Sequence, residues 1–351
     1  MQRSVGGSKA ETPAKRGFAS RSPRRTGLRD LILELHDQIY RRVAVRLATS
    51  LPMAVAYAVA VQQGDIRYML NRSLRDQVES RLEDVLNEDQ ATQEYTSVVR
   101  RYFRLRSCEV LDMALLSGES KEISRLVEVR GRQHIEAAQA NGKGALICTA
   151  HFGHGPNCVA LLSAMGYPST LVARWAFGQR GGSMLRPVDN WILAHHAPRP
   201  NILDRPGDVT AALKAATLLR KNELVSVLID ATVRSRDHRR SVPVSLMNRR
   251  AYLLPGVVTI SKLTGAPILM TLMRRGPDWR HQVIEISSPV SVEGDPSVAL
   301  QRCIKILERE IRRDPAQWTY WGGSYWGSIS RGKRTNIGKK ELGSIYLEPA
   351  Q

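Results

Sequence analysis

Residues 142–175 read GKGALICTAHFGHGPNCVALLSAMGYPSTLVARW, and this stretch decides the fold. The apolar run 144–150 is short and β-rich, and it ends at His151. Residues 157–166 then place apolar side chains at helical spacing, and residues 169–173 form a second β-rich run. A strand, a helix and another strand in this order are typical of an α/β sheet.

The same alternation continues along the chain. Further β-rich runs cover 125–129, 224–229, 266–273 and 282–287, and helical segments cover 133–142, 208–222, 253–265 and 297–313. We therefore predict an α/β fold with helices packed on both faces of the sheet. Residues 266–273 and 282–287 are close enough to form a hairpin, so we expect a mixed, mostly parallel sheet.

The first third of the chain is predicted to be helical, from residue 29 to about 61 and then as two more helices over 68–116. Its most apolar part, residues 43–61, contains Arg46 and Pro52, and the apolar run after Arg46 is too short for the ~20 residues of a membrane-spanning helix. We expect an interfacial helix or a hairpin on a membrane surface. An ordinary buried helix is the alternative.

These patterns divide the chain into four parts. We predict a basic, disordered tail (1–28), a helical, membrane-associated segment (29–116), an α/β domain (117–328) and a basic C-terminal tail (329–351). A transit peptide is the alternative for the first part, and we expect no secretory signal. The four cysteines have no paired spacing, which favours a reducing compartment and no metal site.

The net charge of +19, with a pI near 10.3, predicts acidic partners. Nucleic acid, an anionic membrane surface and an acidic carrier protein all satisfy this charge. No helix-turn-helix, RNP or zinc pattern accompanies it, so we expect no specific nucleic-acid binding.

Two polar clusters follow predicted strands, AHFGHGPN (150–157) and DATVRSRDHRR (230–240). Ligands gather at the carboxyl ends of strands in such sheets. In the first cluster, Gly153 and Gly155 would let the backbone approach a ligand, and the next helix would present N–H groups beside His151. This arrangement suits a general base with an oxyanion site. The alternative is that His151 is only a polar turn residue.

Several blocks together carry a resemblance to a known family. They are residues 127–157, 170–174, 212–230, 253–275 and the block DPAQWTYW at 314–321. In this order they resemble the lipid A acyltransferase branch of the lysophospholipid acyltransferase superfamily, over roughly residues 50–326. The resemblance implies a glycerol-phosphate-acyltransferase-like fold and a membrane-bound enzyme. Such an enzyme moves a fatty acyl group from an acyl carrier protein or coenzyme A thioester to a hydroxyl or amine of a lipid or lipid-like acceptor. We expect no bound cofactor, with the acyl thioester as co-substrate.

The chain departs from the family's signature, a His followed after four residues by Glu or Asp. His151 matches the first member, but Pro156 and Asn157 stand where the acid is expected. The spacing from His151 to Arg174 is about one residue longer than in the family, and an inserted residue would bring Asn157 to that position. Asn157 can accept a hydrogen bond from the imidazole but cannot neutralise an imidazolium. His154 is a second candidate, as a partner or as the base itself.

Other candidates come from the second strand end and the basic runs. Asp230 resembles the family's second acidic position, where it would orient the acceptor or approach His151 in place of the missing carboxylate; capping the loop is the alternative. Arg174, with N–H groups around residues 153–157, would stabilise the oxyanion. The candidates for binding a phosphate group are Arg236, Arg239 and Arg240, because a guanidinium group fits a phosphate well. The alternative is that these residues lie in a solvated loop without such a role.

The sequence thus predicts an acyltransferase with His151 as general base, beside an apolar slot of acyl-chain size. We expect it at the cytoplasmic face of the inner membrane, as a peripheral or monotopic protein. A catalytically degenerate relative that binds acyl chains, lipid or carrier protein is the alternative.

Overall fold

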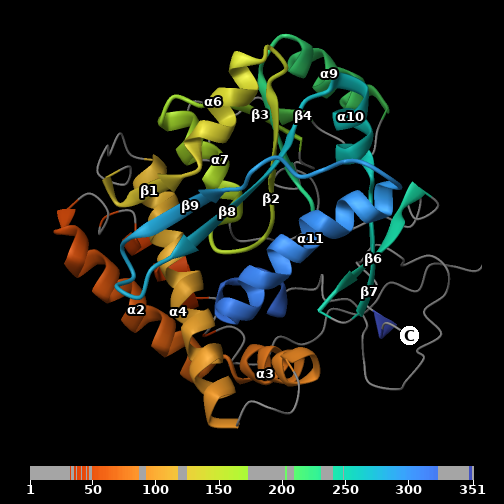
Figure 1. Cartoon of the computed structure of the whole chain (residues 1–351). Coiled ribbons are helices and arrows are strands. Elements are labelled where there is room, and N and C mark those ends of the chain that lie inside the picture. The colour runs from red at the N-terminus through yellow and green to blue at the C-terminus, as the bar shows by residue number, and fades with distance from the viewer. Residues whose placement is uncertain are drawn as a thin grey trace, which may run out of the picture.

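The computed structural model describes most of the chain between residues 51 and 322. The described ranges are 51–86, 92–117, 125–172, 202–203, 209–230, 240–247, 249–322 and 348–349, with single positions between 32 and 50. Within them, a twisted sheet carries helices on both faces, and a group of N-terminal helices packs at one end of it (Figure 1).

Seven of the described strands form one sheet, in the order β1-β9-β8-β2-β5-β3-β4. Their bounds are Val127–Arg130 (β1), Ala145–Thr149 (β2), Ser169–Val172 (β3), Ile202–Leu203 (β4), Leu224–Leu228 (β5), Ile268–Arg275 (β8) and Gln282–Ile286 (β9). Neighbouring strands run parallel except for β8 and β9, which form the predicted hairpin. The predicted mixed, mostly parallel α/β fold is confirmed.

The central strand β2 is buried along its whole length and shows how the two layers of helices are held. Ala145 and Ile147 share one hydrophobic cluster with helices α6 (Arg132–Ala140) and α7 (Gly155–Ala164). Leu146 and Cys148 point to the opposite face and share a second cluster with other helices, namely α9 (Val209–Arg220), α10 (Gly256–Thr264) and α11 (Pro296–Arg313). Successive side chains of β2 therefore point to opposite faces of the sheet and pack against the helices on each face.

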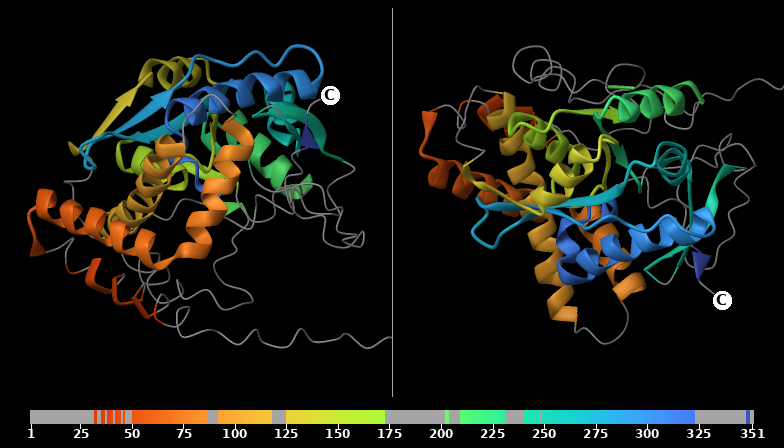
Figure 2. Two further views of the ribbon diagram at one scale, coloured as in Figure 1. Left: turned by 90° about the horizontal axis from the view of Figure 1, so that it is seen from below. Right: turned by 45° about the horizontal axis from the view of Figure 1, so that its top comes forward.

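The N-terminal helices are α2 (Met53–Leu70), α3 (Arg72–Leu86) and α4 (Thr92–Ser117). Residues 29 to about 61 were predicted to be helical, and in the structure α2 starts after Pro52, its N-cap, and continues nine residues beyond Val61. Proline fixes φ and lacks an N–H, so it starts a helix more easily than it continues one. No helix among the described residues is long and apolar enough to cross a membrane. Figure 2 shows α2 at the outer rim of the molecule.

Helix α4 connects this helical group to the sheet. Phe103 belongs to the cluster on one face of the sheet, whereas Leu111 and Leu115 belong to the cluster on the other face. The helical segment and the α/β domain predicted from the sequence therefore share a core in the structure.

Helices α2 and α4 pack closely, and two neighbouring residues explain why. A side chain at Gly64 would overlap the backbone of Arg104 on α4. Asp65 accepts hydrogen bonds from Arg100 and Arg104, both with Nε···Oδ1 distances of 2.7 Å. Burial alone would raise the pKa of the Asp65 carboxyl, but the two guanidinium groups outweigh it and lower the pKa to about 2.

A smaller sheet was not predicted from the sequence. It contains β6 (Val242–Leu246), β7 (Arg249–Leu253) and β10 (Glu348–Pro349), in the order β10-β7-β6. Residues 348–349 lie in the predicted C-terminal tail, where they pair antiparallel with β7. The predicted tail at 1–28 lies outside the described residues. The chain after α11 continues as two short 3-10 turns, η2 (Pro315–Gln317) and η3 (Thr319–Trp321).

We expect Asp65→Asn to lower the free energy of unfolding by about 2 kcal/mol at pH 7, since one pKa unit corresponds to about 1.4 kcal/mol. Because the folded-state pKa is depressed, the contribution of Asp65 is present above the ordinary pKa and disappears as pH falls from about 5 to about 2. Urea titrations of variant and wild type across this range should therefore converge at low pH. The exposed Asp76, paired with Arg72, provides a control, because Asp76→Asn should change stability by less than about 0.5 kcal/mol.

Candidate active site

Two adjacent parallel strands place His151 beside Asp230. In the register of β2 and β5, Thr149 faces Leu228, and each of the two site residues follows two positions later. The carboxyl ends of the two strands thus lie at one edge of the sheet, as the sequence predicted for a ligand site.

The His151 imidazole and the Asp230 carboxylate form a direct pair. Nδ1 of His151 lies 2.8 Å from Oδ1 of Asp230. The backbone N–H of His151 also donates to both carboxylate oxygens, at 3.1 and 2.9 Å. The Asp230 side chain is fully buried, whereas the His151 side chain is 27% exposed. The pair therefore combines a shielded carboxylate with an imidazole that solvent reaches.

Aromatic residues after α11 hold the pair in place. The Tyr320 ring stacks on the His151 ring, with the centroids 4.6 Å apart and the planes at 27°. The Tyr320 hydroxyl donates to the Asp230 carbonyl at 2.9 Å, and Trp318 Nε1 donates to Asp230 Oδ2 at 3.4 Å. These side chains fix the direction of both the imidazole and the carboxylate.

This geometry suits a general base. With Nδ1–H donating to Asp230, the lone pair for proton transfer is on Nε2, at the far side of the ring from the carboxylate. A carboxylate in this place orients the imidazole and stabilises the imidazolium that forms after proton uptake. Asp230 thus occupies the position that the sequence analysis had offered first to Asn157.

Asn157 and His154 lie on a different side of the loop. The Asn157 amide nitrogen is 2.6 Å from Nε2 of His154, and Nδ1 of His154 is 3.0 Å from Oδ2 of Asp112. Asn157 was expected to accept a hydrogen bond from the His151 imidazole, but in the structure its amide group, in the first turn of α7, contacts His154 instead. His154 forms a second, buried histidine–carboxylate pair.

The two glycines of the loop face the protein's own backbone. Gly153 has φ +55°, and a side chain there would overlap the carbonyl oxygen of Met273. A side chain at Gly155 would overlap the carbonyl oxygen of Ala150. The loop is therefore packed tightly against β8 and the end of β2, and the predicted approach of these glycines to a ligand stays a prediction.

Two backbone N–H groups of the predicted oxyanion site form hydrogen bonds with carbonyl groups of the protein. The N–H of Gly153 donates to the Gln317 carbonyl at 2.8 Å, and that of Asn157 donates to the His154 carbonyl at 2.9 Å. Three predicted binding residues, Arg174, Arg236 and Arg239, lie outside the described residues. Arg240 is exposed just before β6, and a role in binding phosphate stays a prediction.

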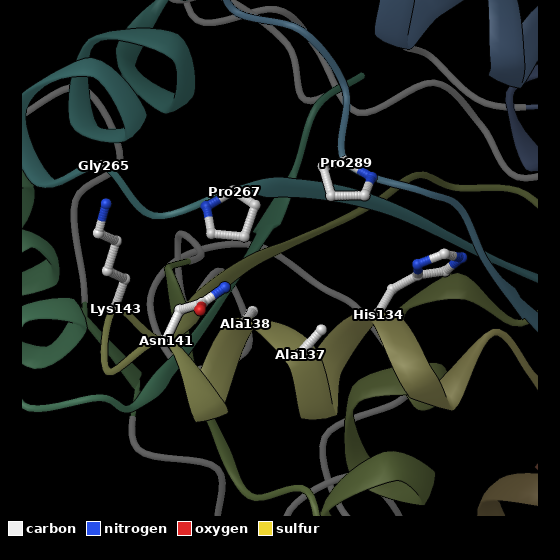
Figure 3. A pocket seen from close by; sticks show the side chains of 8 residues that line it. All are labelled: His134, Ala137, Ala138, Asn141, Lys143, Gly265, Pro267 and Pro289. Atoms are coloured by element: carbon white, nitrogen blue, oxygen red, sulfur yellow. The ribbon is translucent and has the colours of Figure 1, made fainter.

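Three cavities in the part of the chain that the structure describes have linings that do not include His151. One of them, of about 540 Å³, is lined by His134, Lys143, Gly265 and neighbouring residues, at the opposite edge of the sheet where β2 and β8 begin (Figure 3). The segments after β3 and β5, residues 173–201 and 231–239, follow the strand ends that carry the site but lie outside the described residues. The expected acyl slot beside His151 therefore stays a prediction.

Sequence reasoning missed several residues around the site. Asp112 and Arg275 pair in the interior, and Gln317, Trp318 and Tyr320 contact the loop or Asp230. The last three belong to the block DPAQWTYW, which the sequence analysis had quoted as a whole. For Asp112, the available signal was a carboxylate among the apolar residues of a predicted helix.

Comparison with known proteins adds a family match. Residues 197–321 match the model of the family described as bacterial lipid A biosynthesis acyltransferase. The matched region contains Asp230, Arg275 and Trp318 and begins after His151. No curated protein matches the chain. The match supports an acyltransferase of the lipid A type, in agreement with the resemblance found in the sequence.

We expect Gly153→Ala to unfold the loop region and to lower the free energy of unfolding by about 4 kcal/mol or more, because it adds a steric overlap to an unfavourable φ. Gly142 has a similar φ of +68° but no atom within reach of an added side chain. Gly142→Ala should therefore cost only about 1–2 kcal/mol. Chemical denaturation of both variants measures the difference, and equal losses would contradict the packing role of Gly153.

Proposed function

We propose that this protein transfers a fatty acyl chain from the thioester of an acyl carrier protein or coenzyme A to a hydroxyl or amine of a lipid or lipid-like acceptor. His151 acts as the general base and Asp230 as the carboxylate that orients it. The single observation that carries this proposal is the 2.8 Å contact between a partly exposed imidazole and a fully buried carboxylate at neighbouring strand ends.

The reaction follows from these positions. The acceptor oxygen or nitrogen attacks the thioester carbonyl carbon while Nε2 of His151 takes its proton. The tetrahedral intermediate then loses the thiolate as the C–S bond breaks, and the imidazolium returns the proton to sulfur. The products are an ester or amide and a free thiol. Asp230 offsets the charge of the imidazolium between the two proton transfers.

Two further observations support the choice of acyl transfer. The family match to bacterial lipid A biosynthesis acyltransferases includes Asp230 and the segment carrying Trp318. The departure at Asn157, which favoured a degenerate relative, is balanced by the carboxylate of Asp230 beside the imidazole. Binding without turnover remains the alternative that the assay below decides.

We expect His151→Ala to lower acyl transfer by about 10³-fold or more, and Asp230→Asn by about 10²-fold or more, because the base or its orienting charge is lost. Mass spectrometry of acylated lipids formed from an acyl thioester and a lipid extract measures the product. His281 provides a matched control, since it forms a surface pair with Asp278, and His281→Ala should leave the rate unchanged.

Two outcomes would contradict the catalytic proposal. Full activity of His151→Ala would remove His151 from the role of base. Saturable binding of the acyl thioester by a wild-type protein that forms no product would favour the degenerate relative.

We also propose that the protein acts at an anionic membrane surface, with α2 and the residues before it against the lipid. Large apolar side chains are exposed there, namely Ile32, Leu35, Ile39, Val43, Leu51, Val55, Val59, Ile66, Met69 and Leu70. The opposite side of α2 is buried against α4 through residues such as Tyr57 and Ala60. An apolar face of this kind, on a protein with a net charge of +19, fits the surface of an anionic bilayer at the cytoplasmic side of the inner membrane.

We expect Val55→Glu/Val59→Glu to weaken binding to vesicles of phosphatidylglycerol and phosphatidylethanolamine by about tenfold or more, because two carboxylates would enter the lipid interface. The exposed pair Val209 and Leu213 on α9 has the same i, i+4 spacing. Val209→Glu/Leu213→Glu therefore controls for the change in net charge. Equal loss of vesicle cosedimentation in both variants would contradict the assignment of the face on α2.

A further inference from the structure

A buried polar cluster connects the N-terminal helices to the loop that carries His151. We call it the Asp112 cluster, and it comprises Asp112 on α4, Tyr57 on α2, His154 in the loop and Arg275 at the end of β8. The Tyr57 hydroxyl donates to Asp112 Oδ1 at 2.5 Å, and His154 Nδ1 donates to Asp112 Oδ2 at 3.0 Å. Arg275 Nη2 donates to the same Oδ2. Asp112 and Arg275 are 1% and 3% exposed, so the pair is shielded from water.

The cluster reaches the loop by a second route, through Gln317. The Gln317 side chain accepts from the backbone N–H of Arg275 at 2.8 Å and donates to its carbonyl at 3.3 Å. The Gln317 carbonyl in turn accepts from the N–H of Gly153 at 2.8 Å. Arg275 is therefore connected both to His154, through Asp112, and to Gly153, through Gln317.

Every residue of the loop 151–154 is consequently fixed from outside the loop. His151 is held by Asp230, and its carbonyl accepts from the N–H of Thr319 at 2.9 Å. Phe152 forms a β-bridge with Trp318. Gly153 and His154 are held by the two routes described above. The contact of His154 with Asp112 ties this loop to the helical segment, through α4.

Two opposite charges meet inside the cluster. Burial alone would raise the pKa of Asp112, but Arg275 and His154 outweigh it and lower the pKa, so the carboxylate is ionised. The Asn157 amide nitrogen lies 2.6 Å from Nε2 of His154, and with the amide N–H donating to that nitrogen, Nδ1–H points to Asp112. Asp112 and Arg275 form a buried pair of opposite charges.

A buried ion pair contributes little to net stability, because desolvation offsets most of the attraction. Removing one partner is costly, however, and the pair has a definite geometry. These two properties suit a contact that fixes positions rather than one that only adds stability.

We propose that Asp112 is a positioning residue for the reaction of His151, acting through His154 to fix the loop 151–154 relative to helices α2 and α4. The inference rests on the proposed function. His154 serves here as a hydrogen-bond donor to Asp112, and it takes no part in the proton transfer.

Three variants test this role against a matched control. Asp112→Asn removes the charge that Arg275 and His154 share. His154→Ala removes only the contact to the loop and keeps the ion pair, so it tests the proposal even if Asp112→Asn does not fold. His154→Asn restores an amide donor near Nδ1 but cannot transfer a proton. Asp65→Asn is the control, since it breaks a similarly placed carboxylate–arginine contact between α2 and α4 that does not touch the loop.

The first measurement is the rate at which diethyl pyrocarbonate modifies His151, followed by peptide mass spectrometry with the exposed His281 as internal reference. It needs no acyl transfer, so it decides the positioning role even if the proposed function fails. We expect a several-fold higher rate in Asp112→Asn and His154→Ala, because the His151 ring loses its fixed place between Asp230 and Tyr320. His154→Asn and Asp65→Asn should match wild type.

The second measurement is steady-state acyl transfer. We expect kcat to fall by about 10- to 100-fold in Asp112→Asn and His154→Ala with KM within about threefold of wild type, since a displacement of about 1 Å has this effect on a catalytic group. His154→Asn should recover kcat. Unchanged His151 reactivity and kcat in His154→Ala would overturn the proposal, and a His154→Asn variant as slow as His154→Ala would assign the ring itself to proton transfer.

Discussion

The site depends on the parallel register between β2 and β5. Because Thr149 pairs with Leu228, the residues that come two positions after each of them, His151 and Asp230, also lie side by side. The imidazole thus contacts a carboxylate that is 79 positions away in the sequence. A shift of one residue in this register would turn one of the two side chains to the other face of the sheet. The pair therefore depends on the packing of the sheet. Leu146 and Ile147 are buried on opposite faces of β2, and by fixing this strand they also fix the position of His151.

Side chains and backbone groups of the protein provide the hydrogen bonds that water would give to an exposed carboxylate. Asp230 is fully buried, yet its carboxylate accepts hydrogen bonds from His151 and Trp318. A buried charge needs such partners, since removing it from water without them is costly. The chain that follows α11 provides several of them, because residues 317–320 run along the loop and contact it in succession. The site is thus assembled from three segments: the loop after β2, the end of β5 and the turn after α11.

Much of the fold could be predicted from the sequence, because its signals are local. The six β-rich runs and five helical segments of the α/β domain correspond to observed elements, and the hairpin of β8 and β9 followed from their short separation. Strands β6 and β7 were not predicted, and the basic pair Arg249 and Arg250 obscures the apolar alternation of β7. Pro52 was noted as an interruption, but its effect on where α2 starts was not foreseen.

The site was predictable only in part. His151 and Asp230 stand at strand ends, and their approach was one of several predictions from the sequence. The sequence does not decide between Asp230 and Asn157 as the partner of His151, because the answer depends on the direction in which the first turn of α7 faces. Asp112 escaped notice for a similar reason. A carboxylate within a helical segment shows its partners only when that helix is placed against the sheet.

The position of α4 has a consequence for how this chain can be divided. A fragment that starts at residue 117, the predicted boundary, would lack Asp112 and would leave Arg275 as a buried cation without its counterion. It would also expose the apolar surfaces that Phe103 and Leu111 cover in the whole chain. Such a fragment would contain every strand of the large sheet and still be a poor candidate for independent expression. The smallest fragment expected to fold by itself therefore includes the N-terminal helices, although the sequence alone indicates a separate membrane-associated segment.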